Sequence, residues 1–390
     1  MAYLQSRPCR ASFLFLQLLI LSACGSEPSL RKPPVEIWEL ADPTLVLGTR
    51  DDGPAAFSPI RDLEIGPRSE LHVLLLQEHE VRVFSSDGEY VRSIGREGQG
   101  PGEFSRASKI GFVGDTLWVL DSRARKVHFF LDGGFVRVLS LPPVQDLHPE
   151  RSSLAVGILA GPRVLISTAG MGPGHPPVPE EPGLLLTHMD ETFDTLASIN
   201  VDYSGGVVIK KSGGEIEMVH LFFQPFSPTT EWAISPGGAS VVLAGGPTDP
   251  ERSDSIFLVE ISAEGDTLLD LRQPFQGLEI PGPVVDSIVA EIGEDQFSDS
   301  EVRTAAYLPS YYPPVTGLIS GKDGTIWVAR ESLPNRPQQW EVFSSEGTQL
   351  AEIVTPPGFE AMCTDGNVVW GLVLDEFDVP YLVRRPIVRD

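Results

Sequence analysis

Short apolar strands alternate with glycine-containing turns along most of this chain. One hairpin unit is seen six times: a short apolar strand, a turn that contains glycine, and a second, strongly hydrophobic strand. Tight hairpin turns need positive φ, which glycine adopts without a steric penalty. We therefore predict hairpins over residues 60–76, 107–121, 153–168, 230–245, 316–330 and 359–373, with turn glycines Gly66, Gly114, Gly161, Gly238, Gly324 and Gly366.

A second hairpin follows the first within the repeat, and its turn sequence recurs. Val83-Phe84-Ser85-Ser86-Asp87-Gly88 is nearly repeated by Val342-Phe343-Ser344-Ser345-Glu346-Gly347. Four strands per unit, at a period of about 45 residues where no insertion intervenes, are typical of the blades of a β-propeller. Regularly spaced strands also suit a β-sandwich, but the constant four-strand unit favours the propeller.

The two ends of the repeat indicate how the ring closes. The sixth unit has room for only three strands, the third being Tyr381 to Val388, and either Val35–Leu40 or Thr44–Leu47 is available as a fourth. Closure removes exposed strand edges. The predicted fold is all-β: a six-bladed β-propeller with four-stranded blades, one short helical insertion and a ring closed by an N-terminal strand, forming one domain over residues 35–390.

Residues of the second unit resemble a known repeat family. Gly98-Gln99-Gly100-Pro101-Gly102-Glu103-Phe104, then Leu117-Trp118-Val119-Leu120-Asp121 and Arg125-Lys126-Val127-His128-Phe129-Phe130, look like the NHL-type unit. The chain is similar to exported six-bladed propeller lipoproteins of the NHL/TolB-like class, most closely over residues 60–140 and 307–355. The third unit departs from the pattern, because Thr168 stands where the family has Asp.

The N-terminus has the layout of a secretory signal. Arg7 and Arg10 precede an apolar run from Phe13 to Leu21 that is too short to span a bilayer. Leu21-Ser22-Ala23-Cys24 resembles a lipobox, which implies cleavage after residue 23 and acylation of Cys24. The alternatives are an ordinary signal peptide or a buried helix. Residues 24–34, rich in Pro and Ser, are then a flexible tether, and the resemblance implies a cell-envelope protein on the outer membrane.

Charge and cysteine content narrow the classes of partner. Acidic residues outnumber basic ones 54 to 29, giving a net charge of −25, so nucleic acid is not expected as a partner.

The cysteines are Cys9, Cys24 and Cys363. With Cys9 removed and Cys24 acylated, Cys363 has no disulfide partner and is expected to be a small core residue. We expect a monomer.

Three segments interrupt the repeat and are candidates for function. Residues 170–183 are rich in Gly and Pro and predict a loop, while residues 202–223 predict an inserted hairpin. Residues 281–309 are the one helical stretch, with helical spacing of apolar residues and a capping box at Ser298 and Glu301. Helices in this position either line a ligand site or cover exposed apolar edges, and the sequence leaves both open.

No catalytic constellation can be assembled from the sequence. His72, His128 and His188 fall within predicted strands and His175 in the Pro-rich loop, none at metal-ligand spacing. The run Gly95 to Gly102 lacks the Lys-Ser/Thr of a phosphate loop and is interpreted as a connector between blades. No cofactor is predicted.

One enzymatic alternative remains, by resemblance to gluconolactonases and paraoxonase-like lactonases, propellers that hold Ca²⁺ or another divalent cation in the central channel. Acids on the inner strands could supply the oxygen ligands: Asp62, Glu64, Glu231, Glu360 and Asp365. The same acids could equally lie at the rim beside Arg61, Lys109 or Lys322. The preferred hypothesis is a membrane-anchored, non-catalytic module that binds a protein, peptide or glycan; the alternative is a metal-dependent hydrolase or lyase.

Overall fold

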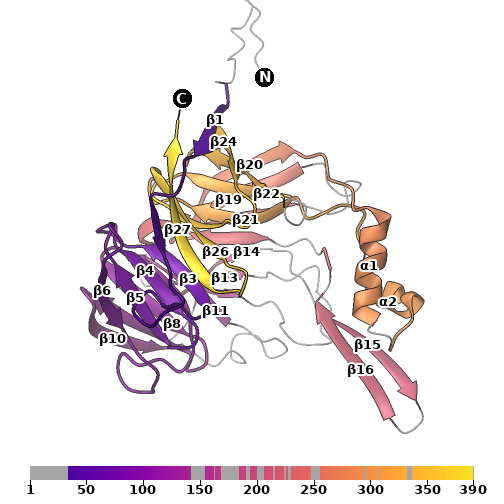
Figure 1. The fold of residues 1–390 in the computed structure, drawn as a ribbon, viewed down its shortest axis with the longest axis horizontal. Coiled ribbons are helices and arrows are strands. Elements are labelled where there is room, and N and C mark those ends of the chain that lie inside the picture. Colours follow the sequence, from indigo (N-terminus) through magenta and orange to yellow (C-terminus); the bar gives the residue numbers. More distant parts are fainter. Residues whose placement is uncertain are drawn as a thin grey trace, which may run out of the picture. The chain divides into compact units, whose positions relative to one another are not determined.

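The predicted hairpins are present as four-stranded antiparallel sheets (Figure 1). The computed structural model describes residues 34–141, 154–161, 163–167, 184–189, 194–199, 206–213, 216–223, 225–226, 230–246, 255–293, 296–306, 308–331 and 336–389. The residues up to 33, where a signal, a lipidated Cys24 and a tether are predicted, and residues 170–183, where a loop containing His175 is predicted, lie outside these ranges.

Each sheet is one blade, and its strands follow one another in chain order. Blade 1 comprises β3 (Ile60–Ile65), β4 (Leu71–Leu75), β5 (Glu80–Phe84) and β6 (Tyr90–Ile94). Blade 2 comprises β7 (Ala107–Val113), β8 (Thr116–Asp121), β9 (Lys126–Leu131) and β10 (Gly134–Ser140). Blade 3 comprises β11 (Leu154–Leu159), β12 (Arg163–Ser167), β13 (Leu184–His188) and β14 (Thr195–Ile199). Blade 4 comprises β17 (Glu231–Ile234), β18 (Ser240–Gly245), β19 (Ser255–Ser262) and β20 (Thr267–Pro274).

The remaining strands form one nine-stranded sheet, because an N-terminal strand joins two blades. Blade 5 comprises β21 (Val315–Ser320), β22 (Ile326–Arg330), β23 (Gln338–Phe343) and β24 (Gln349–Thr355). Blade 6 comprises β25 (Glu360–Thr364), β26 (Val368–Leu374) and β27 (Pro380–Val388), and β2 (Leu45–Leu47) pairs with β27 as its fourth strand. β1 (Glu36–Leu40) pairs with both β24 and β27. Both N-terminal candidates therefore take part in closure.

Packing between blades runs continuously around the ring. The innermost strands contact one another in sequence, β3 to β7, β11, β17, β21 and β25, and β25 contacts β3 again. Six apolar clusters each fill the space between two neighbouring blades; one of them joins Leu382 of blade 6 to Leu63 and Val73 of blade 1. The core thus consists of sheet-on-sheet interfaces, and the predicted propeller arrangement of four-stranded blades is confirmed.

The antiparallel order of the strands gives the ring two different faces. The turns within hairpins lie on one face, here called the turn face: residues 66–70, 85–89, 114–115, 132–133, 235–239, 263–266, 321–325, 344–348 and 365–367. The opposite ends of the strands are joined on the connector face, which includes residues 48–59, 76–79, 95–106, 122–125, 356–359 and 375–379.

Contacts between turns confirm that all blades run in the same direction. Ala160 N donates to Gly238 O over 2.8 Å, and Lys322 N donates to Thr364 O over 2.9 Å. Lys322 Nζ also donates to Gly66 O, so blade 5 reaches past blade 6 to blade 1. On the turn face, contacts therefore cross the ring.

Two insertions leave from the connector face and meet one another. β15 (Gly206–Gly213) and β16 (Ile216–Phe223) form the predicted hairpin between blades 3 and 4. Helices α1 (Gly282–Gly293) and α2 (Asp299–Ala305) lie between blades 4 and 5, and α2 contacts β15 (Figure 1). Phe226 packs edge-on against Tyr312, with ring centroids 5.3 Å apart. Within the described part of the chain, no helix has the length and apolarity needed to cross a membrane.

The helical insertion is a closed excursion with its own small core. Its two ends pair, as Ile280 N donates to Ser310 O over 2.9 Å and Tyr312 N donates to Leu278 O over 3.0 Å. Val289, Phe297 and Val302 pack together in a cluster separate from those between blades. The predicted capping box is present, since Ser298 and Glu301 exchange side-chain and backbone hydrogen bonds. The buried helix faces are therefore occupied by one another.

One detail of the prediction is wrong. Gly66 does not have positive φ; in that turn Ser69 does, with φ of 60°, because the longer turn places its left-handed residue three positions later. The other five turn glycines have positive φ, as expected.

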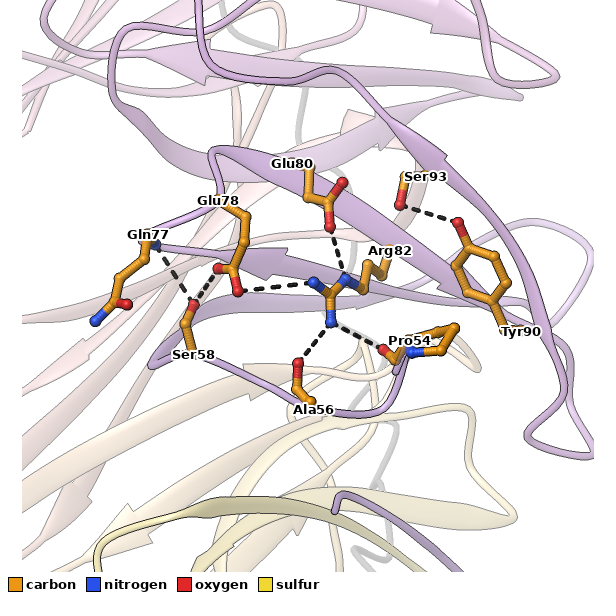
Figure 2. Close-up of polar contacts among 9 residues, drawn as sticks. All are labelled: Pro54, Ala56, Ser58, Gln77, Glu78, Glu80, Arg82, Tyr90 and Ser93. Carbon is orange, nitrogen blue, oxygen red and sulfur yellow. Dashed lines mark hydrogen bonds and ion pairs between the residues drawn. The ribbon is translucent and has the colours of Figure 1, made fainter. Parts of the chain in front are cut away.

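Arg82 fastens the connector that links the closing strand β2 to blade 1 (Figure 2). Its guanidinium donates to Ala56 O over 2.6 Å and to Pro54 O over 3.0 Å, and to Glu80 Oε1 over 2.6 Å. Glu78 lies 3.6 Å away and also accepts from Ser58. Because the Arg82 side chain is only 13% exposed, these bonds are largely shielded from competing water.

Replacing Arg82 with Met is expected to destabilise the protein by about 2–3 kcal/mol, because two carbonyls and a shielded carboxylate lose a charged donor. Urea unfolding measures the loss. Arg96→Met is the matched control: Arg96 pairs with Glu103, but its side chain is 78% exposed, so a loss below about 0.5 kcal/mol is expected. Equal losses in the two variants would contradict this role of Arg82.

Candidate functional site

A repeated backbone irregularity sets the geometry of the inner strands near the connector face. Five of the six inner strands contain a β-bulge close to their first residues. A bulge adds an unpaired residue and re-aims the side chains that follow it. The first paired residues after these bulges are Asp62, Lys109, Gly157, Gly317 and Cys363. Three chemically active side chains therefore occupy equivalent places in neighbouring blades.

Asp62 links blades 1 and 2 through its carboxylate. Its Oδ2 accepts from Ile110 N over 2.9 Å, and its Oδ1 accepts from Leu63 N over 3.1 Å. Both oxygens are therefore already engaged by backbone donors. This fixes the carboxylate and its negative charge at the inner edge of the ring.

Glu64 lies two residues further along β3, on the same side of the strand as Asp62. The pKa of Glu64 is raised to about 8, chiefly because its carboxyl group is withdrawn from water and secondly because Asp62 is negatively charged. The positive charge of Lys109 acts in the opposite direction. At neutral pH Glu64 therefore keeps its proton and can donate a hydrogen bond.

Lys109 and Trp232 meet across blade 3. The Lys109 ammonium lies 4.7 Å from the centroid of the Trp232 ring, within the range of a cation–π contact. The residue between them in the ring is Gly157, where an added Cβ would lie 2.1 Å from Ile234 Cδ1. Because Gly157 has no side chain, blade 4 can approach blade 2 here. The Lys109 ammonium, the Trp232 ring and the protonated Glu64 carboxyl group are therefore close to one another.

The five acids proposed as metal ligands are not brought together. Asp62 and Glu64 are neighbours, but Glu360 begins β25 and Asp365 follows its end, so about 16 Å of strand separates these two. Asp365 is on the turn face, where its Oδ1 accepts from Asn367 N and Val368 N. Glu231 begins β17, at the connector-face end of the ring. Over the described ranges, no group of three or more His, Cys, Asp or Glu has a geometry suited to a metal ion.

Other residues considered as candidates in the sequence lie within strands or are hydrogen-bonded within loops. Cys363 is 8% exposed in the core between blades 6 and 1, as expected, and burial raises the pKa of its thiol. His72 and His128 are buried within β4 and β9, and His188 ends β13. In the glycine-rich run, Glu103 Oε2 accepts from Gly100 N over 2.8 Å and Gln99 N over 3.2 Å. The Glu103 carboxylate thus occupies the backbone N–H groups that a bound phosphate would need.

Asp121, the acid of the family-like Trp-Val-x-Asp strand, has a structural role. It is 1% exposed and accepts backbone hydrogen bonds from Ser105, Arg106 and Ala124 over 2.5, 3.1 and 2.9 Å. It therefore holds the connector into blade 2 against the loop after β8. Sequence reasoning missed Trp232, because only the tertiary contact with Lys109 distinguishes it from other strand tryptophans.

Several solved structures are similar to this one. A member of the DUF4221 family from Bacteroides vulgatus has a TM-score of 0.51 at 10% identity, covering 92% of this chain and 99% of that one. A Bacteroides fragilis protein described as exported has a TM-score of 0.48 at 13% identity, covering 92% and 98%. Virginiamycin B lyase from Staphylococcus aureus has a TM-score of 0.42 at 10% identity, covering 90% and 100%.

At such identities, the likeness to the DUF4221 protein shows a shared fold and no shared activity. No curated protein matches the chain significantly. A family model, DUF5128, described as a six-bladed β-propeller, matches residues 50–148, which contain blades 1 and 2. The chain is therefore an all-β propeller protein, and its first two blades match a family described as six-bladed.

Proposed function

We propose that this chain is a non-catalytic binding module of the bacterial cell envelope, anchored through acylated Cys24, which binds a protein, peptide or glycan at its connector face. One observation carries the proposal. The inserted hairpin and the helices both leave from the connector face, and Asp62 and Lys109, the first paired residues after the bulges, lie toward the same face on their strands. Insertions on a rigid scaffold are the usual place for recognition.

The chemistry near the ring axis supports a polar ligand. Protonated Glu64 and Lys109 are hydrogen-bond donors, and Trp232 presents an aromatic surface. A few polar groups beside an aromatic face are typical of sites that orient hydroxyl- or amide-bearing ligands. The separate core of the helices supports the same conclusion, since Val289, Phe297 and Val302 pack with one another in a cluster distinct from those between blades.

The metal-dependent hydrolase or lyase is less well supported. A hard cation such as Ca²⁺ needs several converging oxygen ligands. Of the five proposed acids, only Asp62 and Glu64 are adjacent on one strand, Asp62 has both oxygens bonded to backbone N–H groups, and Lys109 is close to Glu64. A metal-dependent enzyme stays a prediction, with Asp62 and Glu64 as the remaining candidate metal ligands.

Peptide and glycan arrays probed with the purified protein test the binding proposal. We expect the arrays to identify ligands that bind at least about tenfold more weakly to Lys109→Ala and to Trp232→Ala. This corresponds to a loss of about 1.4 kcal/mol of binding free energy in each variant. Arg68→Ala is the matched control, since Arg68 is a basic residue on the turn face with a 61% exposed side chain. Ligands retained by both site variants, or lost equally in the control, would overturn the assignment of the site.

A further inference from the structure

The direction of β1 determines the face of the ring at which the chain enters. β1 runs parallel to β24, with Glu36 opposite Ala351 and Trp38 opposite Ile353. β24 follows the turn at 344–348 and ends on the connector face. A strand parallel to it therefore begins at the turn-face end, so Val35 lies on the side of the turn face.

Pairing with β27 gives the same result independently. β27 starts at the connector face, after the loop 375–379, and its last residues Ile387 and Val388 pair with Leu40 and Glu39. Figure 1 shows β1 beside the C-terminal end of β27. Residue 35 therefore leaves the ring on the face opposite both described insertions.

The length of the N-terminal segment makes this position consequential. From Cys24 to Pro34 there are eleven residues, and a flexible tether of this length has a root-mean-square span of about 18 Å, although full extension would allow about 40 Å. Strands of six or seven residues give the blades a height of about 20 Å between the two faces. A lipid on Cys24 therefore keeps the turn face close to the bilayer, and the connector face lies one blade height further out.

We propose that the anchored protein turns its turn face toward the membrane and presents its connector face, with both insertions, to the aqueous side. This orientation rests on the proposed acylation of Cys24, and its partner is a phospholipid surface. Attraction by lipid charge is not its cause, because the basic residues in the described turns, Arg68 and Lys322, are outnumbered by acidic ones: Glu70, Asp87, Glu89, Asp115, Asp132, Glu264, Asp266, Asp323, Glu346 and Asp365. The covalent attachment alone sets it.

Energy transfer to a membrane-bound acceptor tests the orientation. Ser345→Cys places a thiol in an exposed turn of the turn face, and Ser287→Cys places one on the exposed side of α1. The native lipoprotein offers little competing thiol, since Cys363 is buried. Each variant is labelled with a maleimide donor and reconstituted into phosphatidylcholine vesicles with an acceptor on the lipid headgroup. We expect transfer from position 345 to be about twofold or more that from position 287, because one blade height separates them.

Two controls separate the orientation from the anchor. A thirty-residue Gly/Ser insertion after Pro34 should make the two transfer efficiencies equal, because the root-mean-square span of the tether then rises to about 35 Å, well beyond the height of the blades. Vesicle flotation of Cys24→Ala tests acylation: unchanged flotation would overturn the anchor, and with it this orientation. Normal flotation with equal transfer from both positions, or with greater transfer from position 287, would overturn the orientation while the anchor stands.

Discussion

A chain that begins at Gly48 and so lacks β1 and β2 is expected to lose its cooperative unfolding transition. The deletion removes Trp38, which is 5% exposed beside Trp327 and has Arg389 4.2 Å above its ring, and Leu47, which is 7% exposed. Each truncation of a core residue of this size costs about 3–5 kcal/mol. Their sum approaches the roughly 5–15 kcal/mol that stabilises a typical domain.

The deletion also uncovers β27, whose Leu382 and Val383 are 0% and 6% exposed in the complete ring. An exposed apolar strand edge promotes association between chains. Urea unfolding followed by tryptophan fluorescence, together with light scattering, measures both effects. Two point variants make the test quantitative. Trp38→Ala should lower the free energy of unfolding by about 3 kcal/mol or more. Val46→Ala should lower it by less than about 0.5 kcal/mol, because Val46 in β2 is 52% exposed. A deleted chain with the wild-type midpoint and slope would show that closure by these strands is dispensable.

Glu64→Gln is expected to make the protein more stable than wild type at alkaline pH and nearly equal to it at pH 4.5. The folded pKa of Glu64, about 8, is above its ordinary value of 4.5. Its contribution to stability is therefore complete below pH 4.5 and is lost as the pH rises through 8. The full shift corresponds to about 5 kcal/mol. Since the residue is half-buried and partly screened by water, we expect a gain of about 2–3 kcal/mol at pH 9.

Urea unfolding of both proteins at pH 5, 7 and 9 measures this difference. His72, whose pKa burial lowers to about 4, titrates in both proteins and cancels from the comparison. Glu360→Gln provides the control, because Glu360 begins another inner strand and is exposed to solvent. Parallel pH profiles for wild type and Glu64→Gln would show that Glu64 is ionised at neutral pH, which would remove the hydrogen-bond donor from the proposed site.

The strands of this protein could be predicted because their signals are local. Alternating apolar residues and turn glycines such as Gly114 and Gly324 depend only on a hairpin's own sequence. The helix α2 was predicted for the same reason, since Ser298 and Glu301 form its capping box within four residues. The failure at Gly66 is also local: a longer turn gave Ser69 the left-handed position, which glycine usually takes.

The site could be predicted only in part, because it depends on contacts between blades. Asp62 and Glu64 are two residues apart, and their proximity follows from the period of a strand. The contact of Lys109 with Trp232 requires blades 2 and 4 to approach each other over Gly157, which no local pattern encodes. The separation of Glu360 from Asp365 could have been predicted from the length of the strand between them.

Closure by strands from both ends has a consequence for the order of folding. Thr44 and Arg384, which are hydrogen-bonded in the finished ring, are 340 positions apart. Contacts of such high sequence separation form late, because the intervening chain must first be brought together. During synthesis, β1 has no partner until β24 has been made, and β2 has none until β27 has been made. We therefore expect the ring to stay open until β27 has been synthesised, with Leu47 available to chaperones throughout that time and Trp38 available until β24 has formed.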